Sequence, residues 1–296
     1  SFPDYDTDDL ASALNDSRSP MINRALYSYS VGSIFKLVTA CEALNEGLDG
    51  YLYDCTGSCD VLGQRFNCHR SDGHGLQDMT EAMTNSCNTY FIELSRCMDG
   101  EAFRRLAFSL GFGREDQLCG GMIGSAGVLP TAEELSVPAE LANFSFGQGR
   151  LTATPLQINR LTCAIANGGN LPMLRITRGI TLDGETVSGE KDPRGSAVIS
   201  PETAHKLTGM MISAIYANES SKAAPESCIA AAKTSTAQTG RFGEDGEELC
   251  HGWITGFFPV RDPKYAVTVL VEDGGYGNDC AAPVFREIID GIMSNA

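Results

Sequence analysis

Apolar residues along this chain first recur at helical spacing and later alternate as they do in strands. In "SIFKLVTACEALNEG" they fall at 34, 37, 38, 41 and 44, so we expect a helix from Ser33 to Asn45 that ends at Gly47. Similar patterns predict further helices over 76–86, 88–98, 101–110, 155–167, 201–219 and 283–296.

Strand patterns dominate the last third of the chain. In "YAVTVLVED", Tyr265, Val267 and Val269 fall on one face and the residues between them on the other. The segments "IAAAKTSTAQTG" and "GWITGFFPV" also read as strands, and "LRITRGITL" alternates before the turn residues of "GETVSG". Residues 1–30 look irregular, and residues 50–75 look rich in loops. Helices in the middle and strands at the end predict an α+β fold with a helical insertion.

Composition limits the classes of function. The chain has 296 residues, of which 42% are hydrophobic, enough for a substantial core. It has no apolar run of about 18 residues that could span a membrane. A net charge of −16, from 22 basic and 38 acidic residues, argues against nucleic-acid binding. The opening "SFPDYDTDD" has no methionine and no basic leader, so we expect a trimmed or processed chain whose upstream anchor is missing.

Eleven cysteines are scattered through the chain. One cluster, in "DCTGSCDVLGQRFNCHRSDGHG", contains Cys55, Cys59, Cys68, His69 and His74. Three thiolates and an imidazole can bind zinc. The spacing matches no paired zinc knuckle, however, which favours a short disulfide-closed loop or free thiols. Both interpretations stay open, and the cysteines do not identify a cellular compartment.

Ser33 and Lys36 form an S-x-x-K pair in an apolar helix. Residues at i and i+3 share a helix face. A lysine accepts a serine proton only if burial or a nearby cation lowers its pKa, and such a pair is a candidate for nucleophilic catalysis. The backbone N–H of Ser33, in the first turn, is also free to act as an oxyanion donor. The pair alone has little specificity, because Lys36 could simply extend out of the helix to solvent.

Two further motifs make the pattern specific. Ser86 and Asn88 form an S-x-N after a predicted helix, and "KTST" begins at Lys233 on a predicted strand. In this order, S-x-x-K, S-x-N and K-T-[GS]-T resemble the penicillin-binding and serine β-lactamase superfamily. Further segments along nearly the whole chain resemble the transpeptidase domain of penicillin-binding proteins: "PDYD" at 3–6, "NRA" at 23–25, "HG" at 74–75, "FGQGRLTATPLQ" at 146–157 and "GWITGFFPVRDPKYAVTVLVE" at 252–272.

This resemblance implies a fold and an activity. Residues 1–296 would be one transpeptidase domain with a five-stranded antiparallel sheet flanked by helices. An all-helical subdomain, roughly 48–165, would be inserted into it, with the active site at the junction. The chain would belong to a monofunctional, class B-like peptidoglycan D,D-transpeptidase. Its partners would be stem peptides ending in D-Ala-D-Ala, β-lactam antibiotics and a cell-wall synthesis complex. It would act outside the cytoplasmic membrane, held by an upstream anchor, with no metal or organic cofactor.

The resemblance also implies residue roles. Ser33 would be the acylated nucleophile and Lys36 its proton acceptor. Ser86 would pass a proton to the leaving amine, and Asn88 would hold a substrate amide and help to fix Lys36. Lys233 would keep the site cationic. Thr234, Ser235 and Thr236 would line the substrate site, with the two threonines binding a carboxylate, and the backbone N–H groups of Ser33 and Thr236 would form the oxyanion hole.

Two positions depart from the family pattern. Ser235 stands where glycine is usual, and Val31 stands where proline is usual. Glycine on a strand that lines a substrate site lets the ligand approach closely, so we expect Ser235 to narrow the cleft or add a hydroxyl there. Val31 removes only a turn constraint.

Other functions of the superfamily fit less well. A D,D-carboxypeptidase has the same chemistry, but "FGQGRLTATPLQ" resembles the transpeptidases more closely. A class A β-lactamase needs a glutamate in an E-x-x-L-N loop, which "AEELSVP" lacks, and class D enzymes and β-lactam sensor domains resemble S-x-V rather than S-x-N. We expect structural roles for His74, Tyr90, His251 and Trp253.

Overall fold

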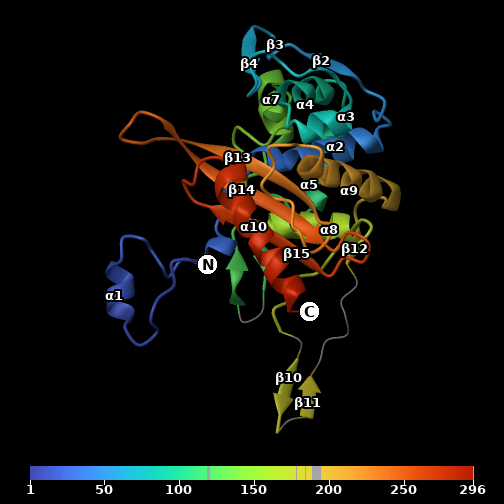
Figure 1. Ribbon diagram of the computed structural model, residues 1–296. Helices are drawn as coiled ribbons and strands as arrows, with labels where there is room; N and C mark the ends of the chain where they lie inside the picture. The colour runs from blue at the N-terminus through green and yellow to red at the C-terminus, as the bar shows by residue number, and fades with distance from the viewer. Residues whose placement is uncertain (119–120, 178, 184, 189–194, 296) are drawn as a thin grey trace.

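A three-stranded antiparallel sheet from the last third of the chain organises the fold (Figure 1). The computed structural model describes residues 1–118, 121–177, 179–183, 185–188 and 195–295. The strands are β13 (Ala231–Phe242), β14 (Glu248–Phe258) and β15 (Tyr265–Val271), in the order β13-β14-β15. All three predicted strand segments of this region are confirmed.

Helices cover both faces of the sheet, because its side chains alternate between two apolar layers. Ile254 and Phe258 of β14 pack in one cluster with Phe285 of α10 (Gly277–Ser294). On the opposite face Trp253 and Phe257 join the main core, which includes α8 (Pro155–Ala166) and α9 (Pro201–Tyr216). The predicted helices over 155–167 and 201–219 are therefore confirmed. The last helix begins six residues before the predicted start, at Gly277 instead of Pro283.

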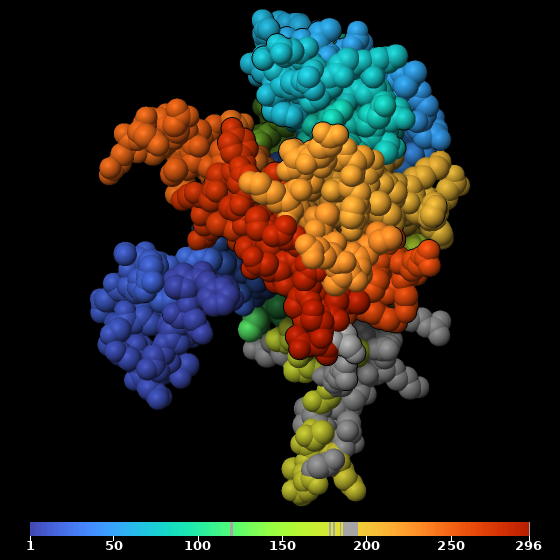
Figure 2. Space-filling model, in the orientation of Figure 1, coloured from blue at the N-terminus to red at the C-terminus, as the bar shows by residue number. Residues whose placement is uncertain are grey.

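The fold class is α+β, as predicted, but the strand count differs from the expected five. Within the described residues the central sheet has three strands, and the remaining strands form separate two-stranded ladders. β1 (Tyr29–Ser30) pairs with β8 (Thr152–Ala153). The polar N-terminal residues offer no alternating apolar run that could extend the sheet; they form α1 (Leu10–Asn15) and η1 (Arg24–Leu26). Figure 2 shows the first residues as a blue lobe standing away from the rest.

A buried helix connects the sheet with the helical part of the molecule. The 3-10 helix η2 (Gly32–Phe35) leads directly into α2 (Lys36–Asn45), so the helix predicted from Ser33 to Asn45 is present. Eight of the ten residues of α2 are buried, because α5 (Gly100–Ser109) and α9 pack against it. Gly47 follows with φ of 74°, which glycine adopts without strain.

The helical part adjoins α2. Its helices are α3 (Met79–Thr84), α4 (Asn88–Ser95), α5 (Gly100–Ser109), α6 (Ala132–Leu135) and α7 (Pro138–Ser145). The first three match predicted helices. Figure 1 shows α3, α4 and α7 on the side of α2 away from the sheet. The part is not all-helical, because residues 50–75, expected as loops, contain short strands: β2 (Tyr53–Cys55), β3 (Ser58–Val61), β4 (Gln64–Asn67) and the start of β5 (Gly75–Gln77). β2 pairs with β5 and β3 with β4.

The boundary of this subdomain remains a prediction. We propose that it ends before α8, because two residues of that helix bond to the sheet. The Asn159 amide donates to Thr268 Oγ1 at 3.3 Å, and the Thr162 and Thr255 hydroxyls lie 2.6 Å apart.

Short ladders complete the described structure. They pair β6 (Asp116–Gln117) with β7 (Ile123–Gly124), β9 (Asn170–Leu171) with β12 (Ser196–Ala197), and β10 (Ile180–Leu182) with β11 (Glu185–Ser188). β11 occupies most of the predicted turn segment "GETVSG", whose two glycines lie outside the described residues. In the described part of the chain, no helix combines the length and apolar character needed to cross a bilayer.

Candidate active site

Ser33 lies at the junction between the sheet and the helical part, in η2. The preceding Gly32 has φ of 63° and donates its N–H to the Gly147 carbonyl at 2.9 Å. A Cβ on Gly32 would lie 2.4 Å from Ser235 Oγ, so a side chain could not fit there. Ser33 is half-buried, and its hydroxyl has no hydrogen-bond partner among the described residues. The nucleophile candidate is therefore free to approach a substrate.

Lys36 is fully buried one turn further along the chain. Its Nζ donates to the Ser86 carbonyl at 2.6 Å and to Asn88 Oδ1 at 2.7 Å, and lies 3.3 Å from Ser86 Oγ. Burial, and then the positive charge of Lys233, lower the pKa of Lys36 to about 7. A lysine in this environment can exist as the neutral amine that a general base must be.

The S-x-N motif occupies the tight turn between α3 and α4, which we call the S-x-N turn (Ser86–Asn88). The Cys87 N–H bonds to the Ala82 carbonyl at 2.9 Å and the Ser86 N–H to Met83 at 3.2 Å, which is the Schellman pattern of a helix C-terminus. Ser86 has φ of 51°, a conformation usually left to glycine. This strained backbone directs the Ser86 hydroxyl toward the two lysines.

Lys233 approaches the same hydroxyl from β13. Its Nζ lies 3.1 Å from Ser86 Oγ and 3.0 Å from the Thr234 carbonyl. Lys233 is 2% exposed, and burial lowers its pKa to about 8. The Ser86 hydroxyl thus lies within hydrogen-bond distance of both lysines. The structure brings together side chains from all three sequence motifs.

The K-T-S-T strand sends alternate side chains in opposite directions. Thr234 and Thr236 are partly exposed, and the Thr236 hydroxyl accepts a hydrogen bond from the Gly277 N–H at 3.2 Å. Ser235 is 3% exposed, and its hydroxyl donates to the Val31 carbonyl at 2.8 Å. The hydroxyl therefore points at the chain entering η2, whereas we expected Ser235 to narrow the cleft or to add a hydroxyl there. A substrate-binding role for Ser235 remains a prediction.

The two expected oxyanion donors lie on neighbouring stretches of backbone. A Cβ built on Gly32 would lie 3.1 Å from the Thr236 carbonyl oxygen, so η2 and β13 are in close contact here. We propose that the N–H groups of Ser33 and Thr236 form the oxyanion hole. Gly32 and the bond from Ser235 to Val31 would hold these two segments in place.

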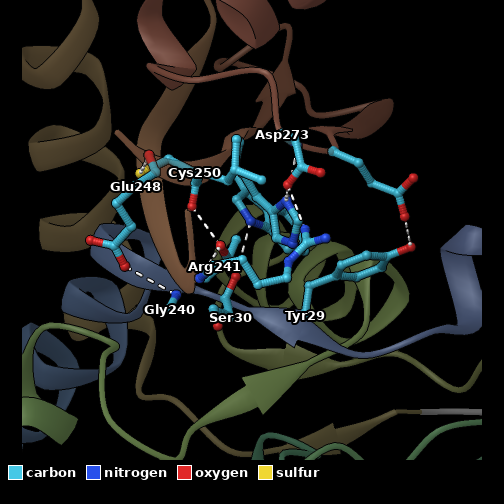
Figure 3. A network of polar contacts seen from close by, with 12 residues as sticks. Tyr29, Ser30, Gly240, Arg241, Glu248, Cys250 and Asp273 are labelled. Carbon is cyan, nitrogen blue, oxygen red and sulfur yellow. Dashed lines mark hydrogen bonds and ion pairs between the residues drawn. The ribbon is translucent and has the colours of Figure 1, made fainter. Parts of the chain in front are cut away.

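His251 and Trp253 belong to a polar network beside this site. Figure 3 shows Tyr29, Arg241 and Asp273 within it. The Asp273 N–H donates to His251 Nδ1 at 3.1 Å, and the Trp253 indole donates to the Ser30 carbonyl at 3.1 Å. These contacts support the structural roles expected for both residues.

The sequence reading missed Glu272, which ties this network to the N-terminal part. It accepts hydrogen bonds from Arg24 Nε and the Tyr29 hydroxyl, each at 2.7 Å. Burial raises the pKa of the Glu272 carboxyl, but the bonds from Arg24 and Tyr29 outweigh that effect, so the net pKa is lowered. A glutamate ending an apolar strand, with an arginine 248 positions earlier, gives no local signal in the sequence.

These motifs, their convergence and the α+β fold define a class of protein. Residues 1–290 match the family model of the penicillin-binding protein transpeptidase domain. The chain belongs to this family.

Particular relatives are longer than this chain. It is 30% identical to the peptidoglycan D,D-transpeptidase PbpA of Mycolicibacterium smegmatis, with 98% of this chain and 62% of that protein covered. It is 31% identical to stage V sporulation protein D of Bacillus subtilis, with 98% and 46% covered. A solved ceftriaxone acyl-enzyme complex of penicillin-binding protein A from Mycobacterium tuberculosis matches with a TM-score of 0.87 and 26% identity, covering 98% of this chain and 69% of that one. The chain thus spans less than two thirds of these curated relatives.

Proposed function

We propose that this chain is the acyl-transfer part of a peptidoglycan D,D-transpeptidase that β-lactams acylate on Ser33. The observation that carries the proposal is the buried Lys36, which contacts Ser86 and Asn88 and follows, by three residues, a serine whose hydroxyl is free among the described residues. Relatives named D,D-transpeptidases and β-lactam acyl-enzymes support it.

The first half-reaction would form the acyl-enzyme. Ser33 Oγ attacks the carbonyl of the penultimate D-alanine while neutral Lys36 accepts the hydroxyl proton. The oxyanion is held by the N–H groups of Ser33 and Thr236. The peptide C–N bond then breaks, and the leaving D-alanine amine takes a proton through the Ser86 hydroxyl.

The second half-reaction would transfer the acyl group. An amine of another stem peptide attacks the ester carbonyl, loses a proton to the same basic group and releases Ser33 with its proton restored. Lys233, Thr234 and Thr236 would hold the terminal carboxylate of the donor, because a cation and two hydroxyls suit an anion. Asn88 would hold a substrate amide.

A β-lactamase is less well supported, because its reaction needs a base that activates water on the acyl-enzyme. In "AEELSVP", Glu134 completes a capping box with Thr131 at the start of α6 and pairs with Arg150. Both contacts occupy its carboxylate in a structural role. No specific contact favours a sensor domain, and a D,D-carboxypeptidase differs only in its acceptor.

The setting of the activity is also part of the proposal. We infer that the whole protein works on the extracytoplasmic face of the membrane, on stem peptides ending in D-Ala-D-Ala. An anchor and contacts to a cell-wall synthesis complex would come from segments outside this chain. The greater length of the relatives supports this inference, and the chain's charge of −16 disfavours nucleic acid as a partner.

Intact-mass spectrometry with benzylpenicillin tests the proposal. We expect one penicilloyl adduct that persists for many minutes and is absent from Ser33→Ala. An adduct that is hydrolysed quickly would indicate a β-lactamase, and no adduct would contradict the role of Ser33. Release of D-alanine from a stem peptide, with and without an added amine acceptor, then separates a transpeptidase from a carboxypeptidase.

A further inference from the structure

Four potential metal ligands, one of which belongs to the S-x-N turn, lie close together. They are Cys55, Cys68, His74 and Cys87, and their ligand atoms all lie within 4.8 Å of one another. The three cysteines are buried and His74 is half-buried. They come from the end of β2, the loop after β4, the loop before β5 and the start of α4. Segments distant in sequence therefore converge on one point.

The spacing of these atoms matches a zinc tetrahedron. Cys68 Sγ lies 3.8 Å from Cys87 Sγ, and His74 Nδ1 lies 3.6 Å from both Cys55 Sγ and Cys68 Sγ. Zn–S bonds of about 2.3 Å and Zn–N bonds of about 2.0–2.1 Å at tetrahedral angles place two sulfurs roughly 3.8 Å apart and a sulfur and a nitrogen roughly 3.6 Å apart. All three measured edges agree with these lengths.

The backbone holds the ligands in this arrangement. The His74 N–H donates to the Cys55 carbonyl at 3.0 Å, and the Cys68 N–H donates to the Gly57 carbonyl at 2.9 Å. Gly57 and Gly73 have φ of 95° and 79°, and a Cβ on either would lie within 2.0 Å of a carbonyl oxygen. Only glycine permits the loops to approach this closely.

Thr89 adds a second layer of contacts. Its hydroxyl donates to Cys55 Sγ at 3.1 Å and lies 3.5 Å from Cys87 Sγ. In metal sites, such hydrogen bonds to the ligand atoms orient the ligating side chains.

We propose that Cys55, Cys68, His74 and Cys87 bind one structural zinc ion that fixes the S-x-N turn to the β2–β5 ladder. Three thiolates and one imidazole form a closed four-ligand set that suits zinc. The ligand set differs from the candidates that the sequence suggested. Cys59 and His69 lie outside it, and Cys87, more distant in sequence, takes part.

The free-thiol and disulfide interpretations are the main rivals. All ten cysteines among the described residues are free thiols, and Cys119 lies outside that part of the chain. The Cys68–Cys87 sulfur separation of 3.8 Å is far longer than a disulfide bond of about 2.05 Å. A disulfide would also leave one thiol of this cluster unpaired.

Because Cys87 belongs to the S-x-N turn, an ion bound to it would also affect catalysis. Cys87 lies between Ser86 and Asn88, whose side chains contact Lys36 on the other side of the turn. An ion that holds Cys87 would therefore restrict the movement of both neighbours. This part of the inference depends on the proposed function, whereas the zinc site itself does not.

Metal content gives the direct test. The chain should be purified without chelators from cells grown with added zinc. Inductively coupled plasma mass spectrometry should then find one zinc per molecule. Cys55→Ser and His74→Ala should lose it, whereas Cys59→Ser and Cys97→Ser, matched controls outside the cluster, should keep it. His74→Cys should also keep it, because four thiolates bind zinc well. Cobalt(II) in place of zinc should give the visible absorption of tetrahedral thiolate coordination.

Other outcomes would overturn the proposal. Zinc absent from the unmodified chain, or a Cys68–Cys87 disulfide found by peptide mapping without reductant, would each do so. Equal zinc in the ligand variants and controls would show adventitious binding. A zinc-free His74→Ala chain that still folds should react with benzylpenicillin severalfold more slowly than the Cys59→Ser control. If zinc is present but no chain is acylated, the proposed function fails and the zinc site stands.

Discussion

At the scale of single residues, the main feature is one serine hydroxyl shared by two buried lysines. Ser86 Oγ lies 3.3 Å from Lys36 Nζ and 3.1 Å from Lys233 Nζ. Two ammonium groups so close together, both removed from water, favour loss of a proton from one of them. The contacts therefore explain how a lysine in this chain could act as a base near neutral pH.

The pH dependence of acylation tests this account. Lys36 has a lowered pKa of about 7 and must be neutral to accept the Ser33 proton, so the rate should fall as pH drops below about 7. Lys233 has a lowered pKa of about 8 and must stay charged to hold a carboxylate, so the rate should also fall above about 8. Stopped-flow acylation by a chromogenic cephalosporin should give a bell-shaped profile.

Lys233→Arg provides the control. A guanidinium stays protonated far above this range, so the variant should lose the alkaline fall and keep the acidic one. A rate that does not change with pH in either protein would contradict the assignment of Lys36 as the base.

At the scale of elements, the active residues lie where helices begin and end. Ser33 lies in the 3-10 turn before α2, Ser86 lies two residues after the end of α3, and Asn88 begins α4. These positions have backbone groups free of helical bonds, and their side chains point into a junction between elements. The cost is local strain, which is most evident at Ser86 with φ of 51°.

Substitutions at Ser86 should separate this strain from the chemistry. Both Ser86→Gly and Ser86→Ala remove the hydroxyl and should slow acylation by a D-Ala-D-Ala substrate by about 10²-fold or more. Ser86→Gly also relieves the left-handed conformation, so it should be more stable than Ser86→Ala by about 1 kcal/mol in urea unfolding. Equal stabilities would mean that the backbone carries no such strain. Unchanged acylation would remove Ser86 from the proton path.

At the scale of the whole molecule, buried polar contacts join the helices to the sheet. The hydroxyls of Thr162 on α8, Thr255 on β14 and Thr268 on β15 form a chain, with separations of 2.6 and 2.7 Å. This chain fixes α8 across two strands. The same sheet carries Lys233. A shift of the sheet relative to the helical part would therefore move Lys233 away from Ser86.

Thr255→Val should weaken this connection. It keeps the shape but removes the central hydroxyl, so the free energy of unfolding should fall by about 1–2 kcal/mol. Thr208→Val is a suitable control, because that hydroxyl bonds only to the Ala204 carbonyl within its own helix, at 2.9 Å. Urea unfolding of both variants measures the difference. Equal effects would mean that the hydroxyl chain adds nothing beyond an ordinary local bond.

The long periodic elements could be predicted, and the short ones could not. A period of 3.6 over ten or more residues located α2, α8 and α9, and strict alternation located β15. β2 to β5 have only three or four residues each, too few to show a period. α6 and α7 were not predicted, although Thr131 and Glu134 form a capping box, and that residue spacing is a sequence signature of a helix N-terminus.

The sequence by itself determined the order of the three motifs, the helix that carries Ser33 and Lys36, and the strand that carries Lys233. These follow from local periodicity and residue type, which need no knowledge of distant segments. Only the tertiary structure decided which groups meet. It buried Lys36 beside Lys233, turned Ser235 toward Val31, and placed Cys87 beside Cys55 and Cys68. Burial, pKa and ligand geometry depend on contacts between segments far apart in the chain, and a linear pattern does not contain them.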